Sequence, residues 1–277
     1  MLPRSTFRVG SRRVEAVSDG WFTMREGFMN VPGYQHNFDD ESGLATFPIA
    51  SFVVYGDQVV LLDAGYGPHE SRNLTGGALL EELAAIGVQP AHVDVIAISH
   101  LHLDHDGWLA TAEAEDVFAK ATIYMGRGDY DLFVRDDADT EPRFKMSPHL
   151  REVLTRLHDD GRVMLIDDAT EIVPGVVALP TPGHTPGHLA FSIRDGGEQL
   201  LVLGDAMYCP AQLTDADLTA MHDVDPVLAR RSRELIQREV EAHGTAAIGC
   251  HFPGLQAARV ISKEVVAVPQ AGQSPIS

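Results

Sequence analysis

The feature that most constrains this chain is a run of four side chains able to bind metal ions: His100, His102, Asp104 and His105. The run follows residues 93–98, an apolar stretch typical of a buried strand. At the end of a strand, His100 and His102 can point the same way, while Asp104 and His105 address a second point nearby. Imidazole and carboxylate suit Zn²⁺ and its first-row neighbours. The alternative, a polar turn with hydrogen-bonded core histidines, would need this spacing to arise by chance.

One such run supplies too few ligands to close two metal sites, so further ligands are expected at other strand ends. Three candidates follow short apolar segments, and these are His184, Asp205 and His251. Together the seven side chains predict two divalent metal ions, with Zn²⁺ preferred and Co, Mn or Fe as alternatives. Cys209 and Cys250 lie beside candidate ligands. We interpret them as small buried residues, with a role at the metal as the alternative.

The rest of the pattern is rich in strands and lacks the regular strand–helix alternation of a doubly wound fold or barrel. Residues 6–24 predict one hairpin, and residues 49–55 and 59–62 predict another across the Gly56-Asp57 turn. Residues 25–48 lack periodicity and predict a long functional loop. Further strands are expected at 93–98, 121–125, 162–166, 171–179, 188–194 and 199–203, and helices at 77–86, 147–158 and 226–243. Segments 163–166 and 200–203 are too apolar to face water, so helices should cover the sheets of this α/β (α+β) fold.

A chain of 277 residues can bury a full core within one large domain. No internal repeat, low-complexity tract or long Pro/Gly/Ser linker divides the sequence. We therefore expect a single domain over residues 1–277. Within it, residues 1–48 would form an N-terminal hairpin plus a loop for substrate or dimer contacts, and residues 49–265 would form the catalytic core.

The net charge is −19, from 21 Lys and Arg against 40 Asp and Glu, and only three of the basic residues are lysines. Because phosphate binding relies on clustered Lys and Arg, this surface disfavours nucleic acid, anionic membranes and polyanionic substrates. The N-terminal sequence shows no apolar signal-peptide core, and no apolar run approaches the length of a membrane-spanning helix. Two cysteines cannot build a disulfide framework. The expected compartment is therefore the cytoplasm.

Taken together, the histidine run and the three later ligands resemble the metallo-β-lactamase superfamily, from about residue 49 to 255. The resemblance implies a four-layer αββα sandwich of two mixed sheets flanked by helices. It also implies the ligand sets: His100, His102 and His184 for the first metal, Asp104, His105 and His251 for the second, and Asp205 as the bridge. Asp63 ends an apolar segment and matches the family's aspartate that orients a ligand histidine. The alternative is an aspartate that caps a turn.

Two local features resemble particular branches of this superfamily. Tyr208 stands three residues after Asp205, as in the N-acyl-homoserine lactonases, where this tyrosine hydrogen-bonds the carbonyl under attack. The alternative is a tyrosine that packs on the strand end. The segment His251-Phe252-Pro253-Gly254 and the loop 215–225 resemble methyl parathion hydrolase and its lactonase relatives. Branches that hold glutathione or process RNA use basic segments, and the sequence contains no such segment.

Methionine and aromatic side chains around the N-terminal loop predict an apolar wall beside the metals, which suits an acyl chain or an aryl group. The residues expected to line this pocket are Trp21, Phe22, Met24, Phe28, Met29, Phe47 and Met207. The alternative is that these side chains fill the core or form the interface of a homodimer. The pocket predicts a small, uncharged, partly apolar ester or lactone as substrate.

The resemblance implies hydrolysis at the two metals. A hydroxide that bridges them would attack a lactone carbonyl, and one metal together with Tyr208 would stabilise the oxyanion. Asp104 or water would return a proton to the leaving alkoxide. The predicted substrate is a lactone of the N-acyl-homoserine type, and an aryl phosphotriester of the methyl-parathion type or another ester or thioester is the alternative. A non-catalytic metal scaffold fits worse, because closed structural zinc sites have four protein ligands, often thiolates.

Overall fold

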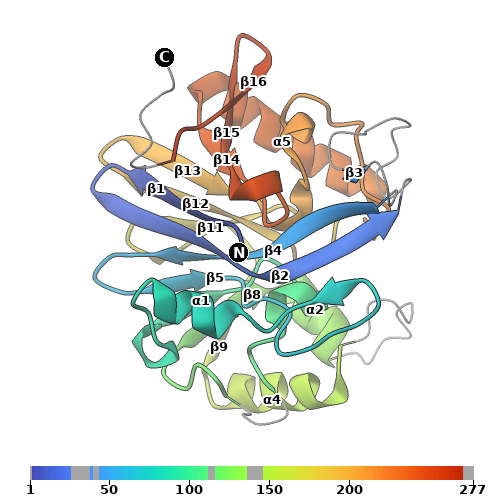
Figure 1. The fold of residues 1–277 in the computed structure, drawn as a ribbon. Coiled ribbons are helices and arrows are strands. Elements are labelled where there is room, and N and C mark those ends of the chain that lie inside the picture. Colours follow the sequence, from blue (N-terminus) through green and yellow to red (C-terminus); the bar gives the residue numbers. More distant parts are fainter. Residues whose placement is uncertain (1, 26–37, 40–43, 112–115, 136–145, 271–277) are drawn as a thin grey trace.

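The computed structural model describes residues 2–25, 38–39, 44–111, 116–135 and 146–270. Two mixed β-sheets pack face to face, and helices lie against their outer faces (Figure 1). This is the four-layer αββα arrangement that the sequence predicted. Among the described helices, none combines the length and the apolar character needed to cross a membrane.

The first sheet contains nine strands. Its main path runs through β1 (Arg4–Val9), β2 (Arg12–Arg25), β4 (Leu44–Val54), β5 (Val60–Leu62), β7 (Val95–Ala97), β8 (Thr122–Gly126) and β9 (Val163–Ile166). Beside this path, β3 (Phe38–Asp39) pairs with β4, and β6 (Leu74–Thr75) pairs with β2. Strands β1, β2, β4 and β5 are antiparallel, whereas β5, β7, β8 and β9 run parallel. The parallel half is short and apolar, as expected for strands covered on both faces.

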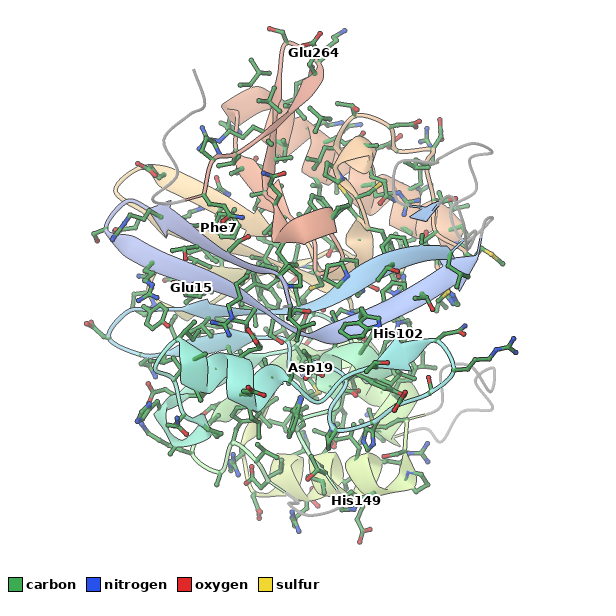
Figure 2. All side chains as sticks on the ribbon, viewed as in Figure 1. Phe7, Glu15, Asp19, His102, His149 and Glu264 are labelled. Carbon is green, nitrogen blue, oxygen red and sulfur yellow. The ribbon has the colours of Figure 1, made fainter. Side chains whose placement is uncertain are left out.

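The second sheet contains seven strands in chain order. They are β10 (Thr170–Val173), β11 (Val176–Pro180), β12 (Leu189–Asp195), β13 (Glu198–Val202), β14 (Ala246–Ile248), β15 (Ala258–Ile261) and β16 (Glu264–Ala267). Only the β13–β14 pair is parallel among them. Glu264, at the tip of the β15–β16 hairpin, and His149 lie at opposite ends of the molecule (Figure 2).

The helices are α1 (Leu79–Ala85), α2 (Leu103–Asp106), α3 (Arg127–Asp129), α4 (Pro148–Asp159) and α5 (Pro226–His243). The two long ones begin with a capping side chain followed by proline. Ser147 Oγ accepts from the Leu150 N–H, and Asp225 Oδ1 accepts from Val227 and Leu228. Helix α5 ends at Gly244 in the left-handed conformation. Both helices were predicted from the sequence, at 147–158 and 226–243, and these caps fix their ends.

Short irregular helices connect the main elements. They are η1 (Pro90–His92), the π-helix η2 (Tyr130–Arg135), η4 (Gly204–Ala206), η5 (Pro210–Leu213) and η6 (Pro253–Leu255). The apolar core has two principal layers. One lies between the sheets and includes Phe52 and Phe191, and the other lies between the first sheet and helices α1 and α4, where Leu83 and Leu154 pack.

The structure corrects two expected segments. The expected loop 25–48 is wrong at its end, because β4 already begins at Leu44 and pairs with β2 as far as Arg25. Hydrogen bonds to the neighbouring strand hold this segment although its sequence has no clear alternation. The expected strand 171–179 is two strands, β10 and β11, because Gly175 adopts a φ of 79° in the turn between them.

Candidate metal centre

The seven candidate ligands lie where strands end, at one edge of the sandwich. Strand β7 leads into the segment with the histidine run, β11 leads to His184, β13 leads to Asp205 in η4, and β14 leads to His251. Because β13 and β14 are parallel neighbours, Asp205 and His251 emerge at the same edge of their sheet. The carboxyl ends of parallel strands are the usual place for a binding site in such sheets.

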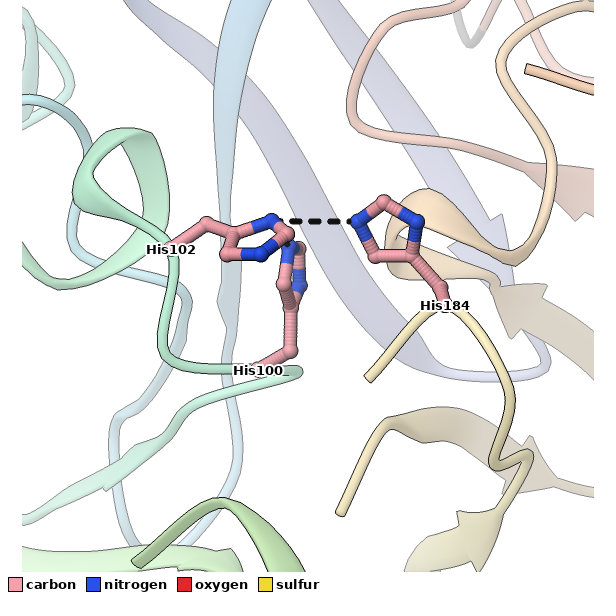
Figure 3. A group of neighbouring side chains, drawn as sticks. All are labelled: His100, His102 and His184. Carbon is pink, nitrogen blue, oxygen red and sulfur yellow. Dashed lines mark hydrogen bonds between the residues drawn. The ribbon is translucent and has the colours of Figure 1, made fainter. Parts of the chain in front are cut away.

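A first group of ligands consists of His100, His102 and His184 (Figure 3). His102 Nδ1 lies 2.9 Å from His100 Nε2 and 3.1 Å from His184 Nε2. Three ring nitrogens therefore converge on one point. A tetrahedral zinc site with normal Zn–N bonds places its nitrogens about 3.3 Å apart, so the spacing in this group is close to that of a zinc site.

A second group consists of Asp104, His105 and His251, and Asp205 lies between the two groups. Asp205 Oδ1 is 3.3 Å from His105 Nε2 and 2.9 Å from His251 Nε2. Asp205 Oδ2 instead faces the first group, 3.6 Å from His184 Nε2 and 3.8 Å from His100 Nε2. One carboxylate thus presents one oxygen to each group, as a bridging ligand does.

Buried atoms in this cluster indicate that it fits metal ions. Nε2 of His105, Nε2 of His251 and Oδ1 of Asp205 are buried and make no hydrogen bond of normal geometry with any described residue. Buried polar atoms without partners are costly. Two divalent cations would satisfy these atoms together with the converging nitrogens of the first group. Nitrogen and carboxylate donors are also the ligand types that zinc and its neighbours accept.

The protein environment divides the histidines into two kinds. Burial lowers the pKa of His100 and His102 well below the usual histidine value, so both are neutral and able to bind metal. Burial acts to lower the pKa of His105 and His251, but the nearby carboxylates, Asp205 first and Asp104 among the others, together outweigh it, so the pKa of both histidines is raised. Burial opposes ionisation of Asp205, yet His251 and His105 hold its pKa well below the usual range. Asp205 is therefore a carboxylate.

The second ring nitrogen of each of four ligands has a polar neighbour. His105 Nδ1 lies 2.9 Å from Asp63 Oδ2, and Asp63 also accepts from the backbone N–H and the hydroxyl of Ser99. His100 Nδ1 lies 3.0 Å from Ser99 Oγ, His184 Nδ1 lies 3.2 Å from Asp223 Oδ1, and His251 Nδ1 lies 2.7 Å from the Pro48 carbonyl. The structure thus places Asp63 beside His105, where it can orient that ring.

Tyr208 contacts the ligand that lies between the two groups. Its hydroxyl donates to Asp205 Oδ2 over 2.6 Å, and its ring stacks on His251 with centroids 5.2 Å apart. Burial and the neighbouring Asp205 charge raise the pKa of Tyr208 well above the usual value. The phenol is therefore protonated and can donate a hydrogen bond. Cys250 is buried, and its Sγ lies 3.2 Å from Asp63 Oδ2.

A cavity of about 250 Å³ opens above the ligands. Apolar side chains from both sides of the opening line it, namely Phe22, Met24, Leu74, Leu101, Leu103, Ala110, Met146 and Leu150. Its polar lining includes His69, Asp104, Asp205, Tyr208 and His222. The cavity is thus an apolar space with a polar floor at the candidate metal centre.

The predicted pocket residues divide into three sets. Phe22 and Met24 line the cavity. Trp21, Phe47 and Met207 do not. Trp21 is 44% exposed in a separate cleft, Phe47 is buried and stacks on Phe22, and Met207 is buried in the core between the sheets. The alternation of side chains along β2 explains the error at Trp21, because neighbours such as Trp21 and Phe22 face opposite sides of the sheet. Phe28 and Met29 lie outside the described residues.

Several residues around the site were not singled out from the sequence. His69 and His222 line the cavity, Asp223 contacts His184, and Asp129 joins two ligand segments. Asp129 accepts from the Leu101 N–H, the Thr185 hydroxyl and the Gly187 N–H over 2.6–2.9 Å. These are single polar residues, three in loops and Asp129 at the end of the short helix α3, without a spacing that a sequence pattern could detect.

This chain is similar to a known family and to several known proteins. The family model for the metallo-beta-lactamase superfamily matches residues 45–251. An N-acyl homoserine lactonase of Bacillus thuringiensis is 29% identical over 161 residues, which are 57% of this chain and 56% of that protein. The N-acyl homoserine lactonase AttM of Agrobacterium fabrum is 27% identical over 188 residues, 63% of this chain and 64% of that protein. The chain therefore spans only a little over half the length of the curated relatives that it matches.

Two solved structures share the fold along nearly the whole chain. AidC, described as a dizinc quorum-quenching lactonase in complex with its product, has a TM-score of 0.78 at 19% identity and covers 99% of both chains. The hydrolase AbOPH, of the beta lactamase superfamily, has a TM-score of 0.80 at 22% identity, again over 99% of both chains. At these identities the likeness is one of fold. Since the family model spans most of the chain and all seven candidate ligands, this chain belongs to the metallo-β-lactamase superfamily.

Proposed function

We propose that this protein is a metal-dependent hydrolase that opens lactones of the N-acyl-homoserine type at a dinuclear centre. The observation that carries the proposal is the position of Asp205. Its two oxygens face different ligand groups, and the Tyr208 hydroxyl binds it at the floor of an apolar cavity. This arrangement joins a metal site, a hydrogen-bond donor and space for an apolar substrate.

The ligands suit two divalent ions, with Zn²⁺ preferred and Co, Mn or Fe as alternatives. When bound, such ions would supply Lewis acidity and a water of lowered pKa at the base of the cavity. The first ion would be held by His100, His102 and His184, and the second by Asp104, His105 and His251, with Asp205 shared.

The chain's own residues would bind and orient the substrate. The protonated Tyr208 phenol lines the cavity, and its single O–H, which here donates to Asp205 Oδ2, would turn to the carbonyl oxygen of a lactone as negative charge develops there. Asp104 also lines the cavity, and its side chain is 14% exposed, so it can return a proton to the leaving alkoxide. Phe22, Met24 and Leu150 would exclude water and hold an acyl chain.

The substrate class follows from charge and lining. The protein carries a net charge of −19, which disfavours anionic substrates. The apolar walls favour an uncharged molecule with an apolar portion. The curated relatives named as N-acyl homoserine lactonases support a lactone. An aryl phosphotriester is the second candidate, because the segment from His251 to Gly254 resembles methyl parathion hydrolase.

The proposal is tested by ranking catalytic efficiency on four substrates with zinc-loaded protein. The panel is a long-chain N-acyl homoserine lactone, a short-chain one, an aryl phosphotriester and a glutathione thioester. We expect the long-chain lactone to rank first, because the cavity walls bind its chain. The Asp205→Ala variant measures the background of each assay. A phosphotriester or a glutathione thioester at the head of the ranking would overturn the lactonase proposal.

A further inference from the structure

A buried chain of polar contacts leads from α5 to the first ligand group. Arg233 lies on α5 with its side chain 1% exposed, and its Nη1 is 3.0 Å from Asp223 Oδ2, whose side chain is 2% exposed. The other oxygen of Asp223 lies 3.2 Å from Nδ1 of His184. His184 Nε2 in turn points to the convergence point of the first group (Figure 3).

We propose that Arg233 and Asp223 are positioning residues that act through His184 and set how tightly the first metal is held. This inference rests on the dinuclear centre of the proposed function, but not on the identity of its substrate. Neither residue lines the cavity, so neither is a catalytic residue.

The contact with Asp223 fixes the chemistry of His184. When the Nδ1–H group donates a hydrogen bond to the carboxylate, Nε2 keeps its lone pair for the metal. The carboxylate also makes the ring more basic, so that Nε2 binds a metal ion more strongly. His105 has the same support from Asp63 in the second group. By contrast, His100 lies against a hydroxyl and His251 against a carbonyl. Each ligand group therefore contains a histidine backed by an aspartate.

Arg233 explains how a second buried carboxylate is tolerated here. A lone buried carboxylate would be costly, and an arginine that keeps its charge at every working pH offsets that cost. Arg233 Nε also donates to the Ala216 carbonyl, so the guanidinium fixes the segment that carries Asp223. Removing the arginine should therefore displace Asp223 or leave its charge uncompensated, and in both cases weaken its hold on His184.

Backbone hydrogen bonds show that the Asp223 segment is docked on the turn of His184. The Val224 N–H donates to the His184 carbonyl over 3.1 Å, and the Asp225 N–H donates to the Gly183 carbonyl over 2.8 Å. Backbone hydrogen bonds of the neighbouring residues and the contact with Arg233 on α5 thus hold Asp223 against the His184 ring. These contacts align its carboxylate with Nδ1.

The test compares metal affinity in three variants and a control. Asp223→Asn and Arg233→Met should lower the affinity for one of the two zinc ions by about 10- to 100-fold, the usual effect of losing a residue that supports a metal ligand. Arg233→Lys keeps the charge and should fall between these variants and wild type. The control, Arg162→Met, removes another arginine–carboxylate pair, with Asp116, and among the described residues the hydrogen bonds of Arg162 go to no candidate ligand, so both affinities should be unchanged. Affinities are measured by chelator competition on zinc-loaded protein.

Two further measurements locate the effect. Anomalous diffraction of zinc-loaded Asp223→Asn crystals should show reduced occupancy at the His100–His102–His184 position and full occupancy at the other. In wild-type protein, ¹⁵N NMR should report His184 with a hydrogen-bonded Nδ1–H, a result that requires no variant to fold.

The inference would be overturned if the variants lost affinity for both zinc ions equally, or if Asp223→Asn bound zinc as tightly as wild type. A His184 ring protonated at Nε2 would also overturn it. Wild-type protein that binds fewer than two zinc ions would overturn it together with the dinuclear centre. Selective loss of the first ion in a protein that does not open lactones would support the inference and reject the proposed substrate.

Discussion

At the residue scale, Met207 and Tyr208 are neighbours in sequence, but their side chains point to different parts of the molecule. The Met207 side chain is buried in the core between the sheets, whereas the Tyr208 hydroxyl reaches Asp205 and lines the cavity. The sequence predicted a role at the site for both. The direction of a side chain after a strand depends on the backbone of the following turn, and no spacing rule describes η4.

Tyr208→Phe tests the hydroxyl directly. We expect turnover to fall by about 10- to 100-fold, on the scale of one lost oxyanion donor or somewhat below it. Stacking on His251 does not need the hydroxyl, so the melting temperature should change little. Steady-state kinetics on a lactone, with zinc content measured in parallel, separates the outcomes. A variant with normal turnover shows a packing role, and one that loses zinc shows that the hydroxyl mainly holds Asp205.

At the element scale, Asp19 of β2 joins three segments that approach the cavity. Its carboxylate accepts hydrogen bonds of 2.7–3.0 Å from five donors, the backbone N–H groups of Tyr66, Gly67, Gly77 and Leu79 and the Trp108 indole N–H. Asp19 lies near the middle of the molecule (Figure 2). A fully buried carboxylate with five donors fixes the approach of α1 and of the loop after β5 to the first sheet.

Asp19→Asn should therefore destabilise the protein by about 3 kcal/mol, because the amide group would face donors with a donor. In a chain of this size the melting temperature would fall by roughly 6–12 °C. Asp94→Asn is the matched control, since the Asp94 carboxylate is more exposed and, within the described part of the chain, accepts from the Val59 N–H and Lys120. Calorimetry gives the melting temperatures of both variants. Equal melting temperatures would show that the hydrogen bonds of Asp19 contribute no more to stability than those of Asp94.

Asp129 links two ligand-bearing segments and predicts a pH effect. Burial raises its pKa to about 6, although three hydrogen bonds act in the opposite direction. Because the unfolded value is lower, the folded protein keeps a proton that the unfolded chain has already lost. Its stabilising contribution is therefore complete below the unfolded pKa and disappears as the pH rises through about 6.

The matched comparison for this effect is Asp129→Asn, which cannot ionise. The free energy of unfolding of wild type, relative to this variant, should decrease by about 2 kcal/mol between pH 4 and pH 7. Denaturant unfolding of both proteins in one buffer series gives the difference in their free energies of unfolding at each pH. Effects of metal and pH that the two proteins share cancel in this difference. A difference that stays constant across this range, or grows with pH, would show that Asp129 is ionised throughout.

The elements themselves were predictable to different degrees. Helix α5 was predicted with its observed bounds from the spacing of its apolar residues, and Asp225, Pro226 and Gly244 mark its two ends in the structure. The start of β4 at Leu44 was missed, because pairing with β2 holds it. The contact between Asp223 and Arg233 was missed for a different reason. It depends on how the loop before α5 docks on the turn of His184, and neither residue belongs to a recognisable motif.

At the scale of the whole molecule, the two sheets bring together ligands that are distant in sequence. The sequence alone predicted these seven residues as ligands, because their segments follow apolar stretches and their combination resembles a known family. It could not provide their distances, which follow from packing of the sheets and from the parallel pairs β5–β7 and β13–β14. The cavity wall also combines residues from both halves of the chain, which explains why His69, Met146 and His222 were not foreseen.

We propose that these residues hold two metal ions with Asp205 between them, and elemental analysis of the purified protein tests this dinuclear centre. We expect about two divalent ions per chain in the wild-type protein. The metal content should fall clearly in Asp205→Ala, because that variant lacks the carboxylate whose oxygens face both ligand groups. Less than one ion per wild-type chain, with the same content in Asp205→Ala, would contradict the dinuclear centre.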